Sequence, residues 1–410
     1  MARLKELLKQ LGIVVVVTFL SLAVLEFGLR TADIPPEPEF GWKWDRSPYK
    51  SAANSGDGRV NELGLRGRPI AYGPNDFVIL LVGDSYVEAG MQVYEDMPEQ
   101  ILESLLRNKY GFDHVRVFSV ASAGWGQDQE LLWLGYYFSR FRANLVLMWL
   151  TPINDYWENS NVDRNISRKA GPLKPTFQLA KDNNLELAYP RQSRFKLRLL
   201  AERAFARLRY RGEAGPEQLY TDQWLQKLPP SNITPVSRLL CPSTEVEQAE
   251  VVASFRNGAP QITAVTTEDV ADGRSHFSHF LVPTSMRQRY QIEITHRLIE
   301  ATARLSQERG AAFRAFFPQG SDIDKALAAV KCVKDAAAGN YYVTDFSDAI
   351  SDLRSSPLQK LLLTVDISSR TPNVISNTDW HLNRDGNFWA MDAVAQQLLA
   401  GNLLHNGVKP

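Results

Sequence analysis

The sequence predicts an α/β protein: a three-layer α/β/α domain around a five-stranded, mostly parallel sheet, a long insertion, and an N-terminal transmembrane helix. Three observations support this prediction. Short apolar runs alternate with segments of helical periodicity, as expected for a parallel sheet that helices cover on both faces. The alternation stops after Asn159 and resumes near Pro283. A long, apolar segment lies close to the N-terminus.

The apolar segment, residues 11–29, is expected to be a signal-anchor helix that stays in the membrane. Its first part, Leu11 to Leu25, contains no charged residue, and Glu26 comes near the far end. At ~1.5 Å per residue the segment spans roughly 28 Å, enough to cross the hydrocarbon core of a bilayer. Three basic residues precede it, so the positive-inside rule predicts a cytoplasmic tail of residues 1–10 and an exported remainder.

Two alternatives to the anchor stay open. A cleaved signal peptide would need a cleavage site of small residues, and no convincing one follows the apolar stretch. A buried helix of a soluble protein would show one apolar stripe, whereas this segment is apolar on every face. The next residues, 30–60, are rich in Pro, Gly, Ser and Asp, and we expect them to form a stalk.

Five segments are expected to form the sheet, each apolar and bounded by turn residues. Segments whose apolar residues have helical spacing lie before or after these strands. The first contains Ile101, Leu102, Leu105 and Leu106, and the others are residues 129–141, 286–309 and 387–399. Strands that alternate with helices favour a doubly wound, flavodoxin-like arrangement. The expected strands are residues 77–82, 115–120, 144–150, 311–317 and 341–346.

The domain organisation follows from where the alternation breaks. Residues 61–158 and 285–403 would form one domain, and residues 159–284 an inserted cap or subdomain, since this stretch is too long for a simple loop. Within the insertion, residues 172–190 are expected to form a β-hairpin. Residues 191–211 contain eight basic residues and one acid among apolar ones. They would form either a helix packed on the core or one facing anionic headgroups or an acidic polymer.

Charge and cysteine content exclude several classes of protein. The 46 basic and 46 acidic residues balance, which argues against a general nucleic-acid binder. Two cysteines are too few for a disulfide scaffold or a structural zinc site, and we expect no metal and no cofactor. Cys241 and Cys332 could form a disulfide if the domain is exported to a compartment that permits disulfides, but the sequence alone leaves this open.

Chemically active residue types follow the predicted strands. Ser85 comes after the first strand in Gly83-Asp84-Ser85, Gly124 after the second, and Asn154 after the third. The carboxyl ends of parallel strands line one crevice, so these residues are expected to meet there. The late pair Asp379 and His381 would supply a base and its partner, because residues two apart on an extended segment face the same side. Taken singly, each also fits a turn, a cap or a surface position.

This set resembles the SGNH superfamily, also called GDSL hydrolases, over residues 61–158 and 285–403. The resemblance implies that Ser85 is the nucleophile, His381 the base and Asp379 its orienting partner. It also implies an oxyanion hole made of Ser85, Gly124 and Asn154. Three departures from the family pattern stand out: Tyr86 in place of Leu, Ser119 where many members have Asn, and a two-residue rather than three-residue Asp–His spacing.

The resemblance implies a membrane-anchored serine esterase of the bacterial inner membrane, single-pass, with its catalytic domain facing the periplasm or cell exterior. Its partners would be membrane lipid, through residues 11–29, and an ester-bearing glycan or lipid carrying an O-acyl group, with no nucleic acid. One alternative is an O-acyltransferase of cell-surface polysaccharide using the same three residues. Another is a non-catalytic envelope protein with this fold. Trp125, Trp157 and Trp380 flank the motifs and would either stack on sugar rings or pack in the core.

Overall fold

The fold is known from a computed structural model. It describes part of the predicted stalk and of the insertion, and residues 35–58, most of the stalk, lie outside the described residues. The described residues are 2–32, 34, 59–61, 63–162, 173–188, 195–209, 217–241, 273, 278–328, 331–334, 339–346, 350–376 and 379–404.

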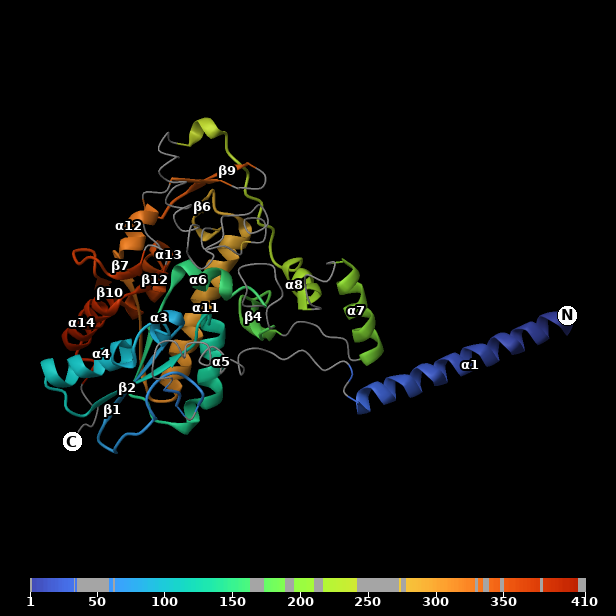
Figure 1. The fold of residues 1–410 in the computed structure, drawn as a ribbon, viewed down its shortest axis with the longest axis horizontal. Coiled ribbons are helices and arrows are strands. Elements are labelled where there is room, and N and C mark those ends of the chain that lie inside the picture. Colours follow the sequence, from blue (N-terminus) through green and yellow to red (C-terminus); the bar gives the residue numbers. More distant parts are fainter. Residues whose placement is uncertain are drawn as a thin grey trace.

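A five-stranded sheet forms the centre of the molecule (Figure 1). Its strands stand in the order β10-β7-β3-β1-β2, and every neighbouring pair is parallel. Renumbered by position in the chain, this is the doubly wound order 2-1-3-4-5 of flavodoxin-like folds. The predicted three-layer α/β architecture is therefore confirmed. The strands are β1 (Phe77–Gly83), β2 (Val115–Ala121), β3 (Leu145–Trp149), β7 (Ala312–Gln319) and β10 (Leu362–Asp366).

The fifth strand of the sheet is not the expected one. The predicted segment forms β9 (Tyr341–Thr344), which lies in a separate antiparallel sheet with β6 (Leu281–Val282) and β8 (Cys332–Lys334). The fifth place belongs to β10, an edge strand in which buried and exposed residues alternate. Because only one of its faces is covered, β10 lacks the continuous apolar run that marks β1 and β3.

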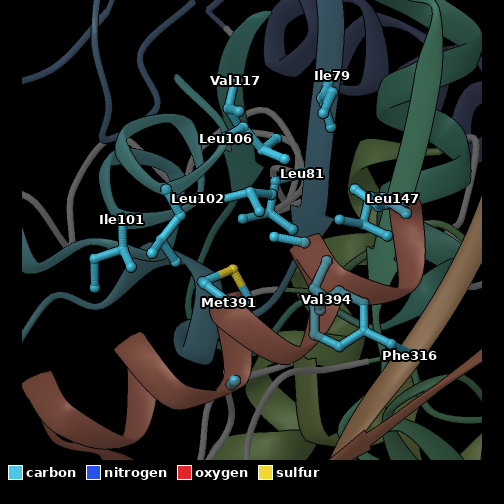
Figure 2. Packing of buried hydrophobic residues seen from close by; sticks show 14 of the residues in the cluster. Ile79, Leu81, Ile101, Leu102, Leu106, Val117, Leu147, Phe316, Met391 and Val394 are labelled. Atoms are coloured by element: carbon cyan, nitrogen blue, oxygen red, sulfur yellow. The ribbon is translucent and has the colours of Figure 1, made fainter. Parts of the chain in front are cut away.

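Helices cover both faces of the sheet, and β1 shows how. Ile79 and Leu81 point toward α4 (Pro98–Ser104) and α14 (Arg384–Ala400). Figure 2 shows side chains of these three elements meeting in one cluster. Val78, Leu80 and Val82 belong to the cluster on the opposite face, under α5 (Gln127–Tyr137) and α11 (Met286–Glu308). A strand with apolar residues at every position is thus buried on both sides.

Side-chain hydrogen bonds fix the first residues of two long helices. A capping box at Ser285 and Gln288 begins α11, and the Asn383 side chain caps α14 by accepting from the Gly386 N–H at 2.8 Å.

The remaining elements are short. The short helices and turns are α3 (Ser85–Glu88), η3 (Tyr94–Asp96), η4 (Leu105–Lys109), η5 (Phe138–Arg140), α6 (Pro152–Glu158), η6 (Arg238–Leu240), η7 (Ser278–Phe280), α12 (Asp322–Ala328), α13 (Ser351–Arg354) and η8 (Pro357–Leu361).

The described part of the insertion has a small apolar cluster of its own. The predicted hairpin is present as β4 (Thr176–Leu179) and β5 (Leu185–Ala188). Two helices follow, α7 (Lys196–Arg209) and α8 (Glu217–Leu225). The cluster consists of Val162, Leu173, Leu199, Tyr220, Trp224, Leu225 and Leu228.

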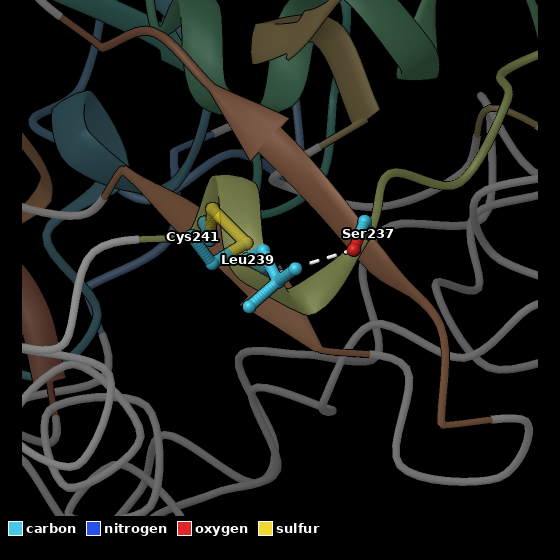
Figure 3. Close-up of a disulfide and its surroundings, with 4 residues drawn as sticks. Ser237, Leu239 and Cys241 are labelled. Atoms are coloured by element: carbon cyan, nitrogen blue, oxygen red, sulfur yellow. Dashed lines mark hydrogen bonds between the residues drawn. A yellow bond between two sulfur atoms is a disulfide. The ribbon is translucent and has the colours of Figure 1, made fainter.

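A disulfide joins the segment after α8 to the second sheet. Cys241 bonds to Cys332 at the start of β8, with the two Cα atoms 5.8 Å apart. The short turn η6 leads into it, where the Ser237 hydroxyl accepts from the Leu239 N–H at 3.3 Å (Figure 3). The pairing that the sequence left open is thus made in this structure.

The N-terminal helix α1 (Ala2–Thr31) stands away from the domain (Figure 1). It is long and apolar enough to span a membrane, with a mean hydropathy of 2.3 over its most apolar window. None of that window is buried against the rest of the described chain.

A buried ion pair ties the insertion to the central domain. Lys174 Nζ lies 2.6 Å from Asp128 Oδ2, and their side chains are 1% and 0% exposed. The Thr176 hydroxyl donates to the same carboxylate oxygen at 2.7 Å. An ion pair with this burial contributes to stability mainly because each charge would otherwise be buried alone.

Replacing Lys174 with Met should lower the free energy of unfolding by about 3–5 kcal/mol, because Asp128 loses its cation while staying buried. Thermal or chemical unfolding of the full chain measures the change. Lys181→Met is the matched control, since Lys181 is exposed at the hairpin turn, and its effect should stay within about 0.5 kcal/mol. Equal effects of the two substitutions would contradict the role given to the ion pair.

Candidate active site

Ser85 stands at the point where the strand order of the sheet reverses. β1 ends at Gly83, and Ser85 is the first residue of α3. Asp84 caps this short helix, its Oδ1 accepting from the Tyr86 N–H at 2.9 Å. A Cβ at Gly83 would lie 2.6 Å from the Val87 side chain, so the turn requires glycine there. In doubly wound sheets the switch point between such strands is where ligands bind.

Two late residues reach Ser85 from a small hairpin. β12 (Asp379–Leu382) pairs with β11 (Val374–Ser376). His381 Nε2 lies 2.8 Å from Ser85 Oγ, and His381 Nδ1 lies 2.6 Å from Asp379 Oδ1. The same carboxylate oxygen accepts from the His381 backbone N–H at 3.1 Å. The two-residue spacing is therefore sufficient, because one carboxylate oxygen of Asp379 contacts both the imidazole ring and the backbone N–H of His381.

Tyr86 holds this hairpin in place. Its hydroxyl donates to the Trp380 carbonyl at 3.0 Å, and its ring centroid lies 4.9 Å from that of His381. Gln92 donates to the Leu382 carbonyl and in turn accepts from Asn387 at 3.0 Å. The departure from Leu at this position therefore has a structural role, because the Tyr86 ring packs directly on the imidazole of His381.

The charges of the site raise the pKa of His381 and lower that of Asp379. Burial alone would lower the pKa of His381, but the hydrogen bond and negative charge of Asp379 outweigh it, with Asp84 and Glu88 adding to the effect. Burial would raise the pKa of Asp379, but its hydrogen bonds to His381 and the charge of the imidazolium outweigh that effect. The protonated ring is therefore stabilised, as a general base requires after it accepts a proton.

Gly124 and Asn154 flank Ser85 on its two sides, because β2 and β3 are the neighbours of β1. Gly124 has a φ of +70°, in a turn closed by the Trp125 N–H and the Ser122 carbonyl at 3.1 Å, and this φ favours glycine. Asn154 lies in the first turns of α6, where its Nδ2 donates to Asp84 Oδ2 at 3.4 Å. Asp84 thus touches both the helix that carries Ser85 and the Asn154 amide.

Buried acids gather behind these residues. Burial raises the pKa of Asp84, and burial together with the nearby Asp84 carboxylate raises that of Asp155 well above the ordinary range. Asp155 accepts from the Thr151 N–H at 2.6 Å and so braces the turn before α6. Within the described residues, no group of three or more His, Cys, Asp or Glu side chains has the arrangement of a metal site.

A cavity of about 270 Å³ opens beside Ser85 and His381. Its wall is mainly apolar, with Met91 and Ile375 exposed at the rim. Glu88 and Gln92 are further polar residues of the wall, and no motif in the sequence marks them. The remaining lining residues are Tyr86, Ala89, Gly90, Ala123 and Leu382.

Of the two alternatives given for Trp125, Trp157 and Trp380, their burial favours packing in the core over stacking on sugar rings. Trp125 and Trp157 are each 1% exposed and offer no ring face to a ligand. Trp125 belongs to the cluster under α5 and α11. Trp380 is 7% exposed and lines a second, smaller cavity of about 50 Å³ behind Tyr86, together with Trp149 and Phe280. All three tryptophan side chains therefore pack beside the segments that carry the candidate site residues.

Comparison with known proteins adds a likeness to a solved structure. No family model matches the chain, and no curated protein matches its sequence. Among solved structures, the chain is similar to a protein described as a GDSL-like lipase from Parabacteroides merdae. The identity is 12%, the match covers 80% of this chain and 96% of that chain, and the TM-score is 0.25. With so low a score the arguments about the site rest on its own geometry.

The acid limb of the pH–rate profile should lie above the ordinary histidine pKa of about 6.5. His381 accepts a proton only when neutral, and its raised pKa moves the loss of kcat/KM to higher pH. Asp379→Asn should shift this limb to lower pH, because it removes the negative charge that raises the pKa of His381. It should also reduce turnover, because the ring loses the carboxylate that accepts from its Nδ1–H and fixes the reactive tautomer. Profiles with a p-nitrophenyl ester measure both effects.

The control for this prediction is Asp385→Asn, an exposed carboxylate in the first turn of α14. It should leave the acid limb where it is in the wild type. An unshifted limb in Asp379→Asn would show that another group sets the pKa of His381.

Proposed function

We propose that the chain is a serine esterase of the SGNH hydrolase type. The observation that carries the proposal is the continuous hydrogen-bonded line from Asp379 through His381 to Ser85 at the switch point of the sheet. A serine hydroxyl is a weak nucleophile until an adjacent base takes its proton. An imidazole 2.8 Å away, oriented by a carboxylate, meets that requirement.

The proposed reaction has two steps. His381 Nε2 takes the proton of Ser85 Oγ as the oxygen attacks the ester carbonyl, and Asp379 stabilises the resulting imidazolium. His381 then gives this proton to the departing alcohol, which leaves an acyl group on Ser85. In the second step water takes the place of the alcohol, again with His381 as base. The acid is released and the free serine is restored.

The oxyanion of each tetrahedral intermediate needs donors that are already in place. We propose the backbone N–H groups of Ser85 and Gly124 and the side-chain amide of Asn154 for this task. Ser85 is the first residue of α3, where backbone N–H groups have no partner within the helix. The contact between Asn154 and Asp84 restrains the amide beside that helix.

For the substrate we propose an O-acyl ester on an envelope glycan or lipid. The mainly apolar cavity beside Ser85 is suited to the acyl part of an ester. The N-terminal helix α1 supports a membrane-anchored protein, and the disulfide supports an oxidising compartment such as the periplasm. We propose the same division of the chain as the sequence suggested, with residues 61–158 and 285–403 catalytic and residues 159–284 inserted.

The nucleophile is tested with a fluorophosphonate probe and intact-protein mass spectrometry. The wild-type chain should gain one covalent adduct, and Ser85→Ala should gain none and lose ester hydrolysis. Ser122→Ala is the control, since Ser122 is buried in the loop after β2 and is not bonded to His381. It should be labelled like the wild type. An adduct on Ser85→Ala would move the nucleophile to another residue.

Asn154→Ala should lower kcat by roughly 10²–10³-fold with a smaller change in KM, because an oxyanion donor acts mainly in the transition state. Steady-state kinetics with the p-nitrophenyl ester measure the change. Asn184→Ala, at the exposed hairpin turn, should leave both constants unchanged. A change confined to KM would make Asn154 a ground-state binding residue.

A further inference from the structure

We propose that α7 lies flat on the surface of the membrane that α1 crosses, with its outer apolar face among the lipid headgroups. The occupant of this face is a bilayer containing anionic lipid. The inference rests on the proposed membrane anchoring of α1, and it concerns how the catalytic domain is held above the bilayer.

The first observation is that α7 is apolar on two opposite faces. Leu199 and Ala206 are buried on the side of α8, where Leu199 joins the cluster with Tyr220 and Trp224. The other face carries residues at positions i, i+4, i+7, i+8 and i+11, a helical stripe. Its last two members, Phe205 and Leu208, are 55% and 80% exposed. The members of this outer stripe are Leu197, Ala201, Ala204, Phe205 and Leu208.

The second observation is that α1 itself holds the start of α7. The Glu26 carboxylate accepts from the backbone N–H groups of Lys196 at 3.0 Å and Leu197 at 2.9 Å. It thereby satisfies donors that the first turn of a helix leaves open. Glu26 also pairs with Arg30 at 2.7 Å. These are the first charged residues after the apolar part of α1, so they belong at the membrane–water interface, and α7 begins at that level.

The third observation is the direction of α7. In Figure 1 it runs crosswise to α1, as a helix parallel to the membrane surface would. The body of the domain and α8 lie on one side of it, and α1 extends on the other. The face turned away from α8 is therefore the face turned toward the bilayer. Helix α1 contacts the start of this face at Leu197, and Phe205 and Leu208 farther along it remain exposed.

The fourth observation is charge. On the helix surface, Arg198 and Arg209 border the outer stripe on one edge and Arg207 on the other. Arg198 pairs with Glu202 at 3.0 Å, and Arg209 lies 3.8 Å from Asp222. Both arginines are largely exposed, at 73% and 52%. Arginines that flank an apolar stripe reach anionic headgroups while the stripe contacts acyl chains.

The test uses the full chain in vesicles of phosphatidylcholine and phosphatidylglycerol. A spin label is placed on one introduced cysteine at a time, because Cys241 and Cys332 are paired. The sites are Leu208→Cys on the outer stripe, Val16→Cys in α1, and Tyr136→Cys, an exposed position on α5. Accessibility of each label to oxygen and to a water-soluble nickel chelate reports its surroundings.

Labels at Val16 and Leu208 should be more accessible to oxygen than to the nickel chelate. The label at Tyr136 should be more accessible to the nickel chelate than to oxygen. A lipid-like reading at Val16 with a water-like reading at Leu208 would overturn the inference and leave the anchor standing. A water-like reading at Val16 would overturn both. Vesicles of phosphatidylcholine alone should make the Leu208 label more accessible to nickel, and an unchanged reading there would overturn the role of the arginines.

Glu26→Gln tests the link between the two helices. It removes the charge that caps α7 while keeping the size of the side chain, so the Leu208 label should become more accessible to nickel and the Val16 label should not change. Glu6→Gln, at the other end of α1, is the control and should leave both readings as they are. If the Leu208 label is equally accessible to nickel in Glu26→Gln and in the otherwise unchanged chain, the inference that α1 places α7 on the membrane is overturned.

Discussion

The hydrogen bond between Ser85 Oγ and His381 Nε2 joins residues 296 positions apart, and much of the fold is arranged around it. Ser85 is fixed by β1 and the short helix α3. His381 sits on a two-stranded hairpin outside the main sheet, and its neighbours Trp380 and Leu382 are buried in two of the apolar clusters. Tyr86 and Gln92, from the segment after Ser85, bond to the backbone on both sides of His381. Ser85 and His381 are thus positioned by the same few residues.

Much of this could be predicted from the sequence. The first four strands are marked by apolar runs, and burial on both faces produces such runs. The predicted strands placed Ser85, Gly124 and Asn154 at strand ends, and the two-residue spacing placed Asp379 and His381 on one side of an extended segment, which is β12 in the structure. The edge strand β10 was missed because half of its residues face solvent. The sequence left two alternatives open for Trp125 and Trp157, which are buried in the structure, because a position beside a motif does not show whether a ring points inward or outward.

Electrostatics link the insertion to the site. Asp84, Asp128 and Asp155 all lie in the interior, and burial raises the pKa of each. Lys174, which precedes β4, contributes a buried cation to this group. Of these three acids, Asp84 adds to the raised pKa of His381, and Asp84 and Asp128 together raise the pKa of Asp155. The insertion therefore does more than cover the domain, because one of its charges lowers the energetic cost of that arrangement.

The separation of Ser85 from His381 has a consequence for synthesis. The chain is made from its N-terminus, so α1 and the nucleophile are complete long before the hairpin that carries the base. A nascent chain that has reached α11 holds Ser85 without any partner to take its proton. In the proposed anchored esterase, this serine would stay unreactive toward the esters of the surrounding lipids while the chain is exported. Only the last stretch to emerge, from Asp379 onward, would supply the base that the proposed nucleophile needs.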